Sequence, residues 1–433
     1  MSIAIPSRST AVSPDAPSSY TVPLAIVTTL FFMWGFLTCL NDILVPHLKS
    51  IFDLNYQQVM LVQFAFFGAY FLFSIPSAKI IDWIGYQRSM VVGLLTMGAG
   101  AFLFVPAAKV PSFGFFLSAL IVLAAGITLL QVAANPYVTV LGPAKTASSR
   151  LNLTQAFNSL GTFLAPFFGG LLILSAAPKA MNEIRAMAPD ALQAYRLHEA
   201  ATVKTPYVGL GIALVVLAIA IGSFKLPKIP QAQHKVGEKV NDSIWRHPNL
   251  ILGAIGIFVY VGAEVAIGSF LVNYFSQPEI GGLTEKVAAS FVAFYWGGAM
   301  VGRFVGSGLL QKVNTGRLLG ICAVCAAALV TMSMIGTGHF AMYSIILVGF
   351  FNSIMFPSIF TLGVAELGPL TGDGSGIMIM AIVGGAIIPL AQGAIADRIG
   401  IHHAFFLPVI CYLYILYFAL SGSKPNSERH ARS

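Results

Sequence analysis

Charged side chains are scarce in this sequence. Only 9% of its 433 residues are Asp, Glu, Lys or Arg, and 57% are hydrophobic, whereas an average soluble domain is about 25% charged. A water-soluble fold could not hide this much apolar surface from water. The scarcity of charge therefore excludes a soluble globular protein and indicates that lipid surrounds much of the chain.

Cysteine clusters and catalytic motifs are also lacking. All four cysteines lie in apolar segments, so no disulfide framework is indicated. Cys322 and Cys325 have the spacing of a metal motif, but no His is near, and we expect thiols packed between helices and no metal site. The stretch "GDGSG" at 372–376 is not followed by Lys-Ser or Lys-Thr, which excludes a phosphate-binding loop. We expect no cofactor, apart from a transported H⁺ or Na⁺, and no enzyme activity.

Long apolar runs are what the sequence has instead. Runs of about 20 residues predict transmembrane helices, whereas the strands of a membrane β-barrel would alternate polar and apolar residues. The sequence therefore predicts an all-α membrane protein with about twelve transmembrane helices in two six-helix halves. The expected helices are 22–48, 58–81, 89–108, 113–140, 150–175, 206–225, 249–275, 287–310, 317–335, 340–366, 372–395 and 403–422.

Polar segments divide the chain. Residues 1–20 are rich in Ser and Pro and lack an apolar core, which predicts a disordered cytoplasmic tail rather than a signal peptide. The N-terminal half is expected at 21–225 and the C-terminal half at 249–422. A basic cytoplasmic linker at 226–248 joins them, and 423–433 is expected to be a second cytoplasmic tail.

The positions of Lys and Arg predict the orientation. With both termini and the linker inside the cell, sixteen of the 24 Lys and Arg residues fall on the cytoplasmic side, Arg303 among them. Cytoplasmic loops of membrane proteins carry an excess of these residues. We therefore expect both termini to be cytoplasmic.

The two halves are similar to each other. "QVAANPYVTVLG" at 131–142 matches "NSIMFPSIFTLG" at 352–363, which places Pro136 over Pro357 at an offset of 221 residues. Two parallel repeats of six helices are the arrangement of the major facilitator fold, in which substrate sites lie near the membrane midplane.

The repeat also relates the carboxylates of the first helix in each half. Asp42 corresponds to Glu264 at an offset of 222, and Gln131 corresponds to Asn352. A carboxylate at the centre of a membrane helix costs at least about 2.5–3.5 kcal/mol to insert. Such residues are therefore candidates for function.

Four segments resemble the fucose permease branch of the major facilitator superfamily: "WGFLTCLNDILVP", "AANPYVTVLGP", "RLNLTQAFNSLG" and "YVGAEVAIGSFL". The similarity covers nearly the whole chain and is greater to the bacterial glucose/galactose permease group than to the L-fucose/proton symporter. The stretch "DWIGYQRS" also fits the general facilitator motif between helices 2 and 3, which implies a gating or structural role for Asp82, Gly85 and Arg88. The resemblance implies sugar uptake across the bacterial inner membrane, driven by a cation gradient, and we expect a monomer.

The resemblance also shows two departures. Asp42 matches the essential aspartate on the first helix of the L-fucose symporter, but the essential glutamate on its fourth helix is Gln131 here, and an amide cannot carry a proton. Conversely, Glu264 occupies a position that is an amide in that symporter. We therefore assign cation coupling to Asp42 and Glu264, and sugar hydrogen bonding to Gln131.

Polar side chains recur at helical spacing within the apolar segments. On the first helix, Trp34, Thr38, Asn41 and Asp42 share one face, which must point into the protein because lipid cannot satisfy it. A ring would pack on the C–H face of a sugar, and amides would bind its hydroxyls. The lining is expected to continue with Gln63, Tyr70, Gln131, Asn135, Gln155, Asn158, Tyr260, Glu264, Asn273, Tyr295, Trp296 and Asn352.

Purely structural explanations remain open for several of these residues. Asn135 could bond backbone freed by Pro136, Gln63 could join helices, and Trp296 could be a packing aromatic. We expect Arg150, at a helix start, to be structural.

For function, the sequence predicts import of a neutral hexose by H⁺ or Na⁺ symport. Glucose or galactose is favoured, followed by fucose or N-acetylglucosamine. A lining poor in Arg and Lys disfavours sugar phosphates, and the scattered charge disfavours nucleic acid. A passive facilitator, a non-transporting sugar sensor and, less favoured, a membrane enzyme remain alternatives.

Overall fold

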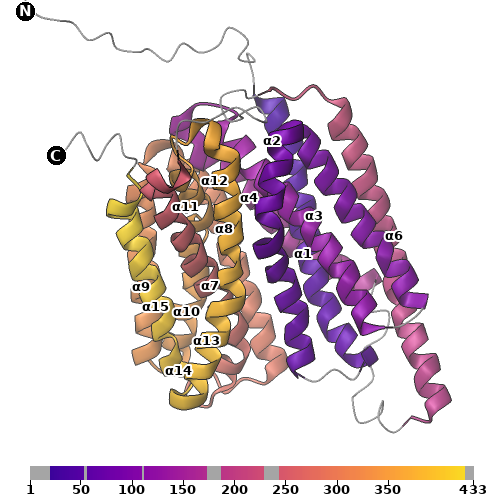
Figure 1. The fold of residues 1–433 in the computed structure, drawn as a ribbon. Helices are drawn as coiled ribbons and strands as arrows, with labels where there is room; N and C mark the ends of the chain where they lie inside the picture. The colour runs from indigo at the N-terminus through magenta and orange to yellow at the C-terminus, as the bar shows by residue number, and fades with distance from the viewer. Residues whose placement is uncertain (1–19, 53–55, 110–111, 173–186, 229–242, 425–433) are drawn as a thin grey trace, which may run out of the picture.

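The computed structural model describes residues 20–52, 56–109, 112–172, 187–228 and 243–424. Its described secondary structure is helical, and the helices form two groups that lie side by side (Figure 1). The N-terminal group comprises α1 (Thr21–Phe52), α2 (Tyr56–Lys109), α3 (Phe113–Val140), α4 (Ala147–Leu172) and α6 (Pro189–Ser223). The C-terminal group comprises α7 (Pro248–Ser276), α8 (Glu285–Lys312), α9 (Thr315–Ile335), α10 (Gly338–Asn352), α11 (Met355–Gly363), α12 (Thr371–Met380), α13 (Gly384–Ile399), α14 (Ile401–Ala404) and α15 (Phe406–Tyr417).

These helices make twelve spans in the described chain. The long helix α2 contributes two spans, and α10 with α11, α12 with α13, and α14 with α15 contribute one each. Eight described stretches are long and apolar enough to cross a membrane by length and composition. The predicted fold class, an all-α membrane protein with about twelve spanning helices, is confirmed.

The first difference from the sequence prediction is at Gly85. A loop was expected between helices at 58–81 and 89–108, but α2 runs through this region and only Gly85 leaves the helical conformation, with φ 80° and ψ 167°. A positive φ is accessible to glycine without the steric cost that a Cβ imposes. A single residue therefore makes the kink between the two spans.

The second difference is the start of α6. It begins at Pro189 rather than at the expected 206, and Figure 1 shows its lower end extending beyond its neighbours. The added residues include many helix formers, such as Ala, Leu, Gln and Glu, and proline is favoured in the first helical turn. The length of the apolar run predicted only the apolar part of this helix, Lys204–Ser223.

The third difference is a break in the expected helix 340–366. α10 ends at Asn352 and α11 begins at Met355, two residues before Pro357. Proline lacks an N–H and its ring crowds the preceding turn, which interrupts the helix there. The corresponding Pro136 lies inside the continuous helix α3, so the two repeats differ at this point.

The two groups of helices meet mainly through four pairs: α4 with α8 and α11, and α12 with α2 and α3. These contacts include the kink of α2, the start of α4 and the start of α12, which lie at one end of the bundle, uppermost in Figure 1. We call this the Gly85 end. The opposing chain segments are thus closely packed at this end of the molecule.

Glycine permits the close approach of α1 and α4. A Cβ added at Gly35 would lie 2.0 Å from the carbonyl oxygen of Asn158, and one added at Gly161 would lie 2.2 Å from that of Phe32. Small residues of this kind let helix backbones pack closely in membranes.

We therefore expect Gly35→Ala to destabilise the protein by about 1–3 kcal/mol, the usual cost of overpacking. Gly209→Ala on α6 is the matched control, because nothing lies within 4 Å of its added Cβ and alanine favours a helix. Thermal unfolding in detergent should show a lower Tm for the first variant and an equal or higher Tm for the second. Equal Tm values for Gly35→Ala and the parent would contradict the packing.

Candidate functional site

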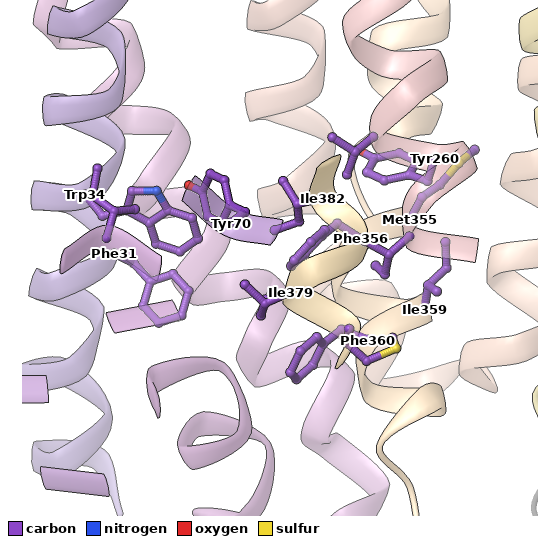
Figure 2. Packing of buried hydrophobic residues seen from close by; sticks show 14 of the residues in the cluster. Phe31, Trp34, Tyr70, Tyr260, Met355, Phe356, Ile359, Phe360, Ile379 and Ile382 are labelled. Atoms are coloured by element: carbon purple, nitrogen blue, oxygen red, sulfur yellow. The ribbon is translucent and has the colours of Figure 1, made fainter. Parts of the chain in front are cut away.

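The N-terminal half buries a cluster of polar groups around the hydroxyl of Tyr70. The Gln131 side-chain Nε2 donates to this hydroxyl at 2.7 Å, and the indole of Trp34 is a second donor, with its nitrogen turned toward it in Figure 2. All three side chains are buried. The remaining acceptor of the amide, Gln131 Oε1, has no partner in the protein.

The C-terminal half buries a similar cluster on α7, α8 and α10. Asn352 Nδ2 donates to the Tyr295 hydroxyl at 2.9 Å, and the Tyr260 hydroxyl donates to the backbone oxygen of Asn352 at 3.1 Å. The carboxyl group of Glu264 lies beside the Tyr260 hydroxyl, and its Oε1 has no hydrogen-bond partner.

The two clusters repeat the same bond. Gln131 and Asn352 correspond in the sequence repeat, and each donates its amide to a tyrosine of the second span of its own half, Tyr70 or Tyr295. Each amide also keeps an oxygen that has no partner. The internal similarity of the sequence thus corresponds to a repeated amide–tyrosine pair.

Apolar side chains lie between the clusters. Figure 2 shows Ile379 of α12 and Ile382 of the following 3-10 turn (Ala381–Val383) between Tyr70 and Tyr260, with Phe356 of α11 next to them. All three are buried, and α12 packs against α2 and α3. The polar clusters of the two halves therefore lie at a similar height in the bundle, and an apolar layer separates them.

Several buried polar side chains, in the clusters and elsewhere in the spans, are incompletely bonded. An unpaired buried donor or acceptor costs about 1–3 kcal/mol. A ligand with both donors and acceptors would satisfy these groups. The unpaired atoms are Gln131 Oε1, Asn135 Oδ1 and Nδ2, Gln155 Nε2, Glu264 Oε1, Asn352 Oδ1, and Gln392 Oε1 and Nε2.

Gln392, on α13, was not identified from the sequence. It is fully buried. The sequence could have indicated Gln392, because it is an amide side chain inside an apolar segment.

Other predicted lining residues lie apart from these clusters. Asn158 Nδ2 donates to the backbone oxygen of Phe31 at 2.9 Å and so joins α4 to α1. Asn273 is exposed near the end of α7, and Trp296 is 42% exposed with its ring against Gly268. These three do not join the hydrogen bonds around Tyr70 or Tyr295. The side chains of Thr38, Asn41, Asp42 and Gln63 lie outside the described part of the structure, and their roles stay predictions.

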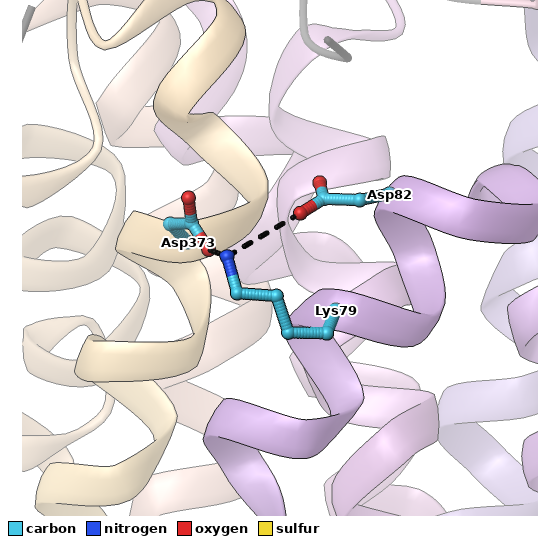
Figure 3. A network of polar contacts seen from close by, with 3 residues as sticks. All are labelled: Lys79, Asp82 and Asp373. Atoms are coloured by element: carbon cyan, nitrogen blue, oxygen red, sulfur yellow. Dashed lines mark hydrogen bonds and ion pairs between the residues drawn. The ribbon is translucent and has the colours of Figure 1, made fainter. Parts of the chain in front are cut away.

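The facilitator-like motif lies at the Gly85 end. Lys79 Nζ is 3.0 Å from Asp373 Oδ1 on α12 and 3.7 Å from Asp82 Oδ2, so one cation joins the two halves (Figure 3). Gly85 makes the kink described above, and Arg88 is exposed.

Arg150 has a structural environment. Its guanidinium donates to the backbone oxygens of Val138, Thr139 and Pro143 at 2.8–3.3 Å, and it faces the ring of Tyr20. These carbonyls belong to the end of α3 and the turn after it, where helical backbone oxygens lack partners. Arg150 caps this helix end.

Arg303 was placed with the cytoplasmic charges by sequence. The expected helix 287–310 already contains it, and the structure shows where it lies along that helix: Arg303 is inside α8, nine residues before its end at Lys312. Its side chain is partly buried and bonds groups of both halves. Sequence counted Arg303 only as a topology charge, although it lies within the expected helix, and did not identify its contacts with the N-terminal half.

We predict that Tyr295→Phe and Tyr70→Phe each destabilise the protein by about 1–3 kcal/mol, because each leaves a buried amide donor unpaired. Tyr343→Phe is the matched control, since Tyr343 is 57% exposed and keeps its ring next to His339. Thermal unfolding would measure the three variants. A Tm unchanged in both site variants would show that the amide–tyrosine bonds do not stabilise the fold.

Comparison with known proteins gives the same fold for nearly the whole chain. The family model described as Major Facilitator Superfamily matches residues 25–382. The chain is 51% identical over 410 residues to the glucose/galactose transporter of Brucella abortus biovar 1 (strain 9-941), covering 95% of this chain and 96% of the relative. It is 36% identical over 418 residues to the L-fucose-proton symporter of Escherichia coli (strain K12), covering 94% and 95%.

Solved structures of other transporters have the same fold as this chain. A variant of the E. coli fucose:proton symporter FucP superposes with a TM-score of 0.87 at 34% identity, over 94% of this chain and 100% of that one. FucP in the outward conformation superposes with a TM-score of 0.86 at 34% identity, over 94% and 99%. A proton:xylose symporter shares the fold with a TM-score of 0.71 at 12% identity, over 94% and 97%. With two six-helix groups, a repeated buried amide in each and a family match over most of its length, the chain belongs to the major facilitator superfamily of membrane transporters.

Proposed function

We propose that the protein is a secondary active transporter that imports a neutral hexose together with a cation, by alternating access of a central site. The observation that carries the proposal is the full-length similarity to the Brucella glucose/galactose transporter, at 51% identity. The similarity to an L-fucose-proton symporter supports a sugar and a coupling cation. Glucose or galactose is the favoured substrate, ahead of fucose and N-acetylglucosamine.

The chemistry of the site supports a neutral sugar. The buried clusters offer the Trp34 ring, two tyrosines held by amides, and unpaired amide oxygens, and other buried amides of the spans keep unpaired donors. Sugar hydroxyls both donate and accept hydrogen bonds, so they match such a set. A phosphorylated sugar would require a cationic site. These groups are neutral, and Arg303, the cation near the C-terminal cluster, is bonded to α4 and to the backbone of Ser353.

Hydrogen bonds between the halves support a state that is closed at the Gly85 end. Among the described residues they include Lys79 to Asp373, Ser149 Oγ to the backbone oxygen of Ser307 at 2.7 Å, and Ser148 to Thr361 at 2.6 Å. We assign this end to the cytoplasm from the excess of Lys and Arg there. The similarity to a symporter in the outward conformation supports a site closed toward the cytoplasm.

For coupling, we propose Asp42 as the principal carboxylate and Glu264 as a second cation or sugar contact, acting in a monomer in the bacterial inner membrane. H⁺ is favoured over Na⁺. In the part of the chain that the structure describes, His, Cys, Asp and Glu form no group of three or more that could hold a metal ion, and we propose no cofactor. A passive facilitator or a sensor would not need the two carboxylates.

Substrate class is tested by a thermal-shift screen of the purified protein with a panel of sugars. Glucose or galactose should raise the Tm, by an amount that grows with the logarithm of sugar concentration above its Kd. Mannitol and glucose 6-phosphate serve as controls for ring form and charge. Stabilisation by the phosphorylated sugar without a response to neutral hexoses would overturn the proposal.

Coupling is tested by Asp42→Asn and Glu264→Gln in proteoliposomes. The asparagine side chain is neutral and cannot take up and release the coupling cation. Asp42→Asn should therefore abolish accumulation of sugar against its gradient and retain counterflow of labelled sugar. Glu264→Gln should weaken accumulation less. If Asp42→Asn accumulates sugar with unchanged dependence on pH and Na⁺, the first-helix carboxylate has no coupling role.

A further inference from the structure

Arg303 is a cation placed well inside the membrane-spanning bundle. It lies nine residues before the end of α8, which at 1.5 Å per residue is about 14 Å from that helix end. Charged residues at such depth are expensive and face the protein interior or a water-filled cavity. Its position therefore requires an explanation from its neighbours.

The hydrogen-bond partners of its guanidinium are neutral and come from both halves. Arg303 donates to the Ser159 hydroxyl and to the backbone oxygen of Gln155, both on α4, the second at 3.4 Å. In its own half it donates to the backbone oxygen of Ser353, in the break between α10 and α11, at 3.4 Å. The side chain thus bridges the two halves without an ion pair among the described residues.

A series of hydrogen bonds places Glu264 near this guanidinium. Arg303 donates to the backbone oxygen of Ser353, the adjacent Asn352 donates to the Tyr295 hydroxyl, and that hydroxyl donates to the backbone oxygen of Glu264 at 3.4 Å. Glu264 also interacts electrostatically with the guanidinium. The other titratable groups around Glu264 in the described structure are Tyr260 on α7, Tyr295 on α8 and Tyr412 on α15. Arg303 is the cation among these groups. It is therefore shared between Glu264, in the polar cluster of the C-terminal half, and α4, in the N-terminal half.

The α4–α8 contact continues from Arg303 toward the Gly85 end. Asn152 Nδ2 donates to the backbone oxygen of Arg303 at 2.7 Å and contacts the Ser307 hydroxyl at 3.2 Å. Ser149 then donates to the backbone oxygen of Ser307 at 2.7 Å. Arg303 occupies the deepest position of this row of bonds, the one nearest to Glu264.

Lys79 provides a comparison within the same molecule. It precedes Arg303 by 224 residues, close to the repeat offset, and it also bonds across the halves, from α2 to Asp373 on α12. Two carboxylates, Asp373 and Asp82, lie within 4.0 Å of Lys79, and its side chain is 52% exposed. Two nearby carboxylates balance the charge of Lys79, whereas among the described residues no carboxylate lies within 4.0 Å of Arg303.

We propose that Arg303 is a positioning residue that connects Glu264 to closure of the Gly85 end, because one guanidinium bonds α4 and also the backbone of Ser353, next to the cluster that holds Glu264. An ionised Glu264 draws the guanidinium toward α7 and weakens the α4–α8 contact. A neutral Glu264 leaves it on Ser159 and the Gln155 carbonyl. The inference rests on the proposed function only for the role of Glu264 as a cation or sugar contact.

The test measures closure directly and needs no transport. With the four native cysteines replaced by alanine, Ser149→Cys places a thiol in the buried α4–α8 contact. The rate of its labelling by a membrane-permeant maleimide reports opening of the Gly85 end. We expect Arg303→Gln to raise this rate roughly tenfold, as for loss of hydrogen bonds to a charged group, and Arg303→Lys to give an intermediate rate.

Epistasis with Glu264 separates this role from simple packing. Glu264→Gln should lower the labelling rate of the parent and should leave the rate of Arg303→Gln unchanged, because its effect passes through the guanidinium. Lys79→Gln is the matched control: it should also raise labelling, and Glu264→Gln should lower that raised rate by the same factor as in the parent, since independent sites add.

Two results would overturn the proposal. One is a labelling rate that Arg303→Gln does not change. The other is an equal factor for Glu264→Gln with and without Arg303, which would mean that the two residues act separately. Both outcomes are independent of which sugar is carried, so a failure of the substrate assignment would leave this test intact.

Discussion

Lipid cannot hydrogen-bond, and this constraint governs most of the molecule. Each polar side chain within the spans must find a partner inside the protein or leave an unpaired group at a cost. Many do find partners, including Arg150 at the end of α3 and Asn158 on the α1 backbone. The amides that keep unpaired atoms, such as those of Gln131 and Asn352, stand out against this background. Their incomplete bonding is what indicates a place for a polar ligand.

The same constraint explains how the halves share a site. Each half satisfies its own tyrosine with its own amide, and no protein hydrogen bond is needed between the clusters. Lys79 and Ser149 bond across the halves at the Gly85 end, and Arg303 and Ser375 bond across them deeper in the bundle. Each half thus bonds its own amide and tyrosine, and a separate set of bonds joins the halves.

Hydropathy and the internal repeat predicted the fold class well, because lipid imposes long apolar runs and duplication leaves matching residues such as Pro136 and Pro357. They did not predict the features that depend on local backbone chemistry or on neighbours distant in sequence. The kink at Gly85 needed one residue with positive φ, and the polar start of α6 carries no apolar signal.

The candidate site was predicted in part for the same reason. Gln131, Glu264 and Asn352 were recognisable as polar residues at corresponding positions, and the structure places them in buried clusters. Their tyrosine partners lie 57 and 61 residues away in sequence, which spacing alone cannot pair. The partners of Arg303 on α4 are 144 and 148 residues away, so its contacts could not be inferred from spacing either.

The apolar layer between the clusters has a consequence for selectivity. Ile379, Ile382 and Phe356 stand between the polar groups of the two halves (Figure 2). A ligand that touches both halves must reach across this layer. Its binding to both clusters therefore depends on its length as well as on the positions of its hydroxyl groups. A short polyol or a single water can satisfy one cluster without joining the halves. Discrimination against such small solutes then follows from geometry, before any stereochemical contact is made.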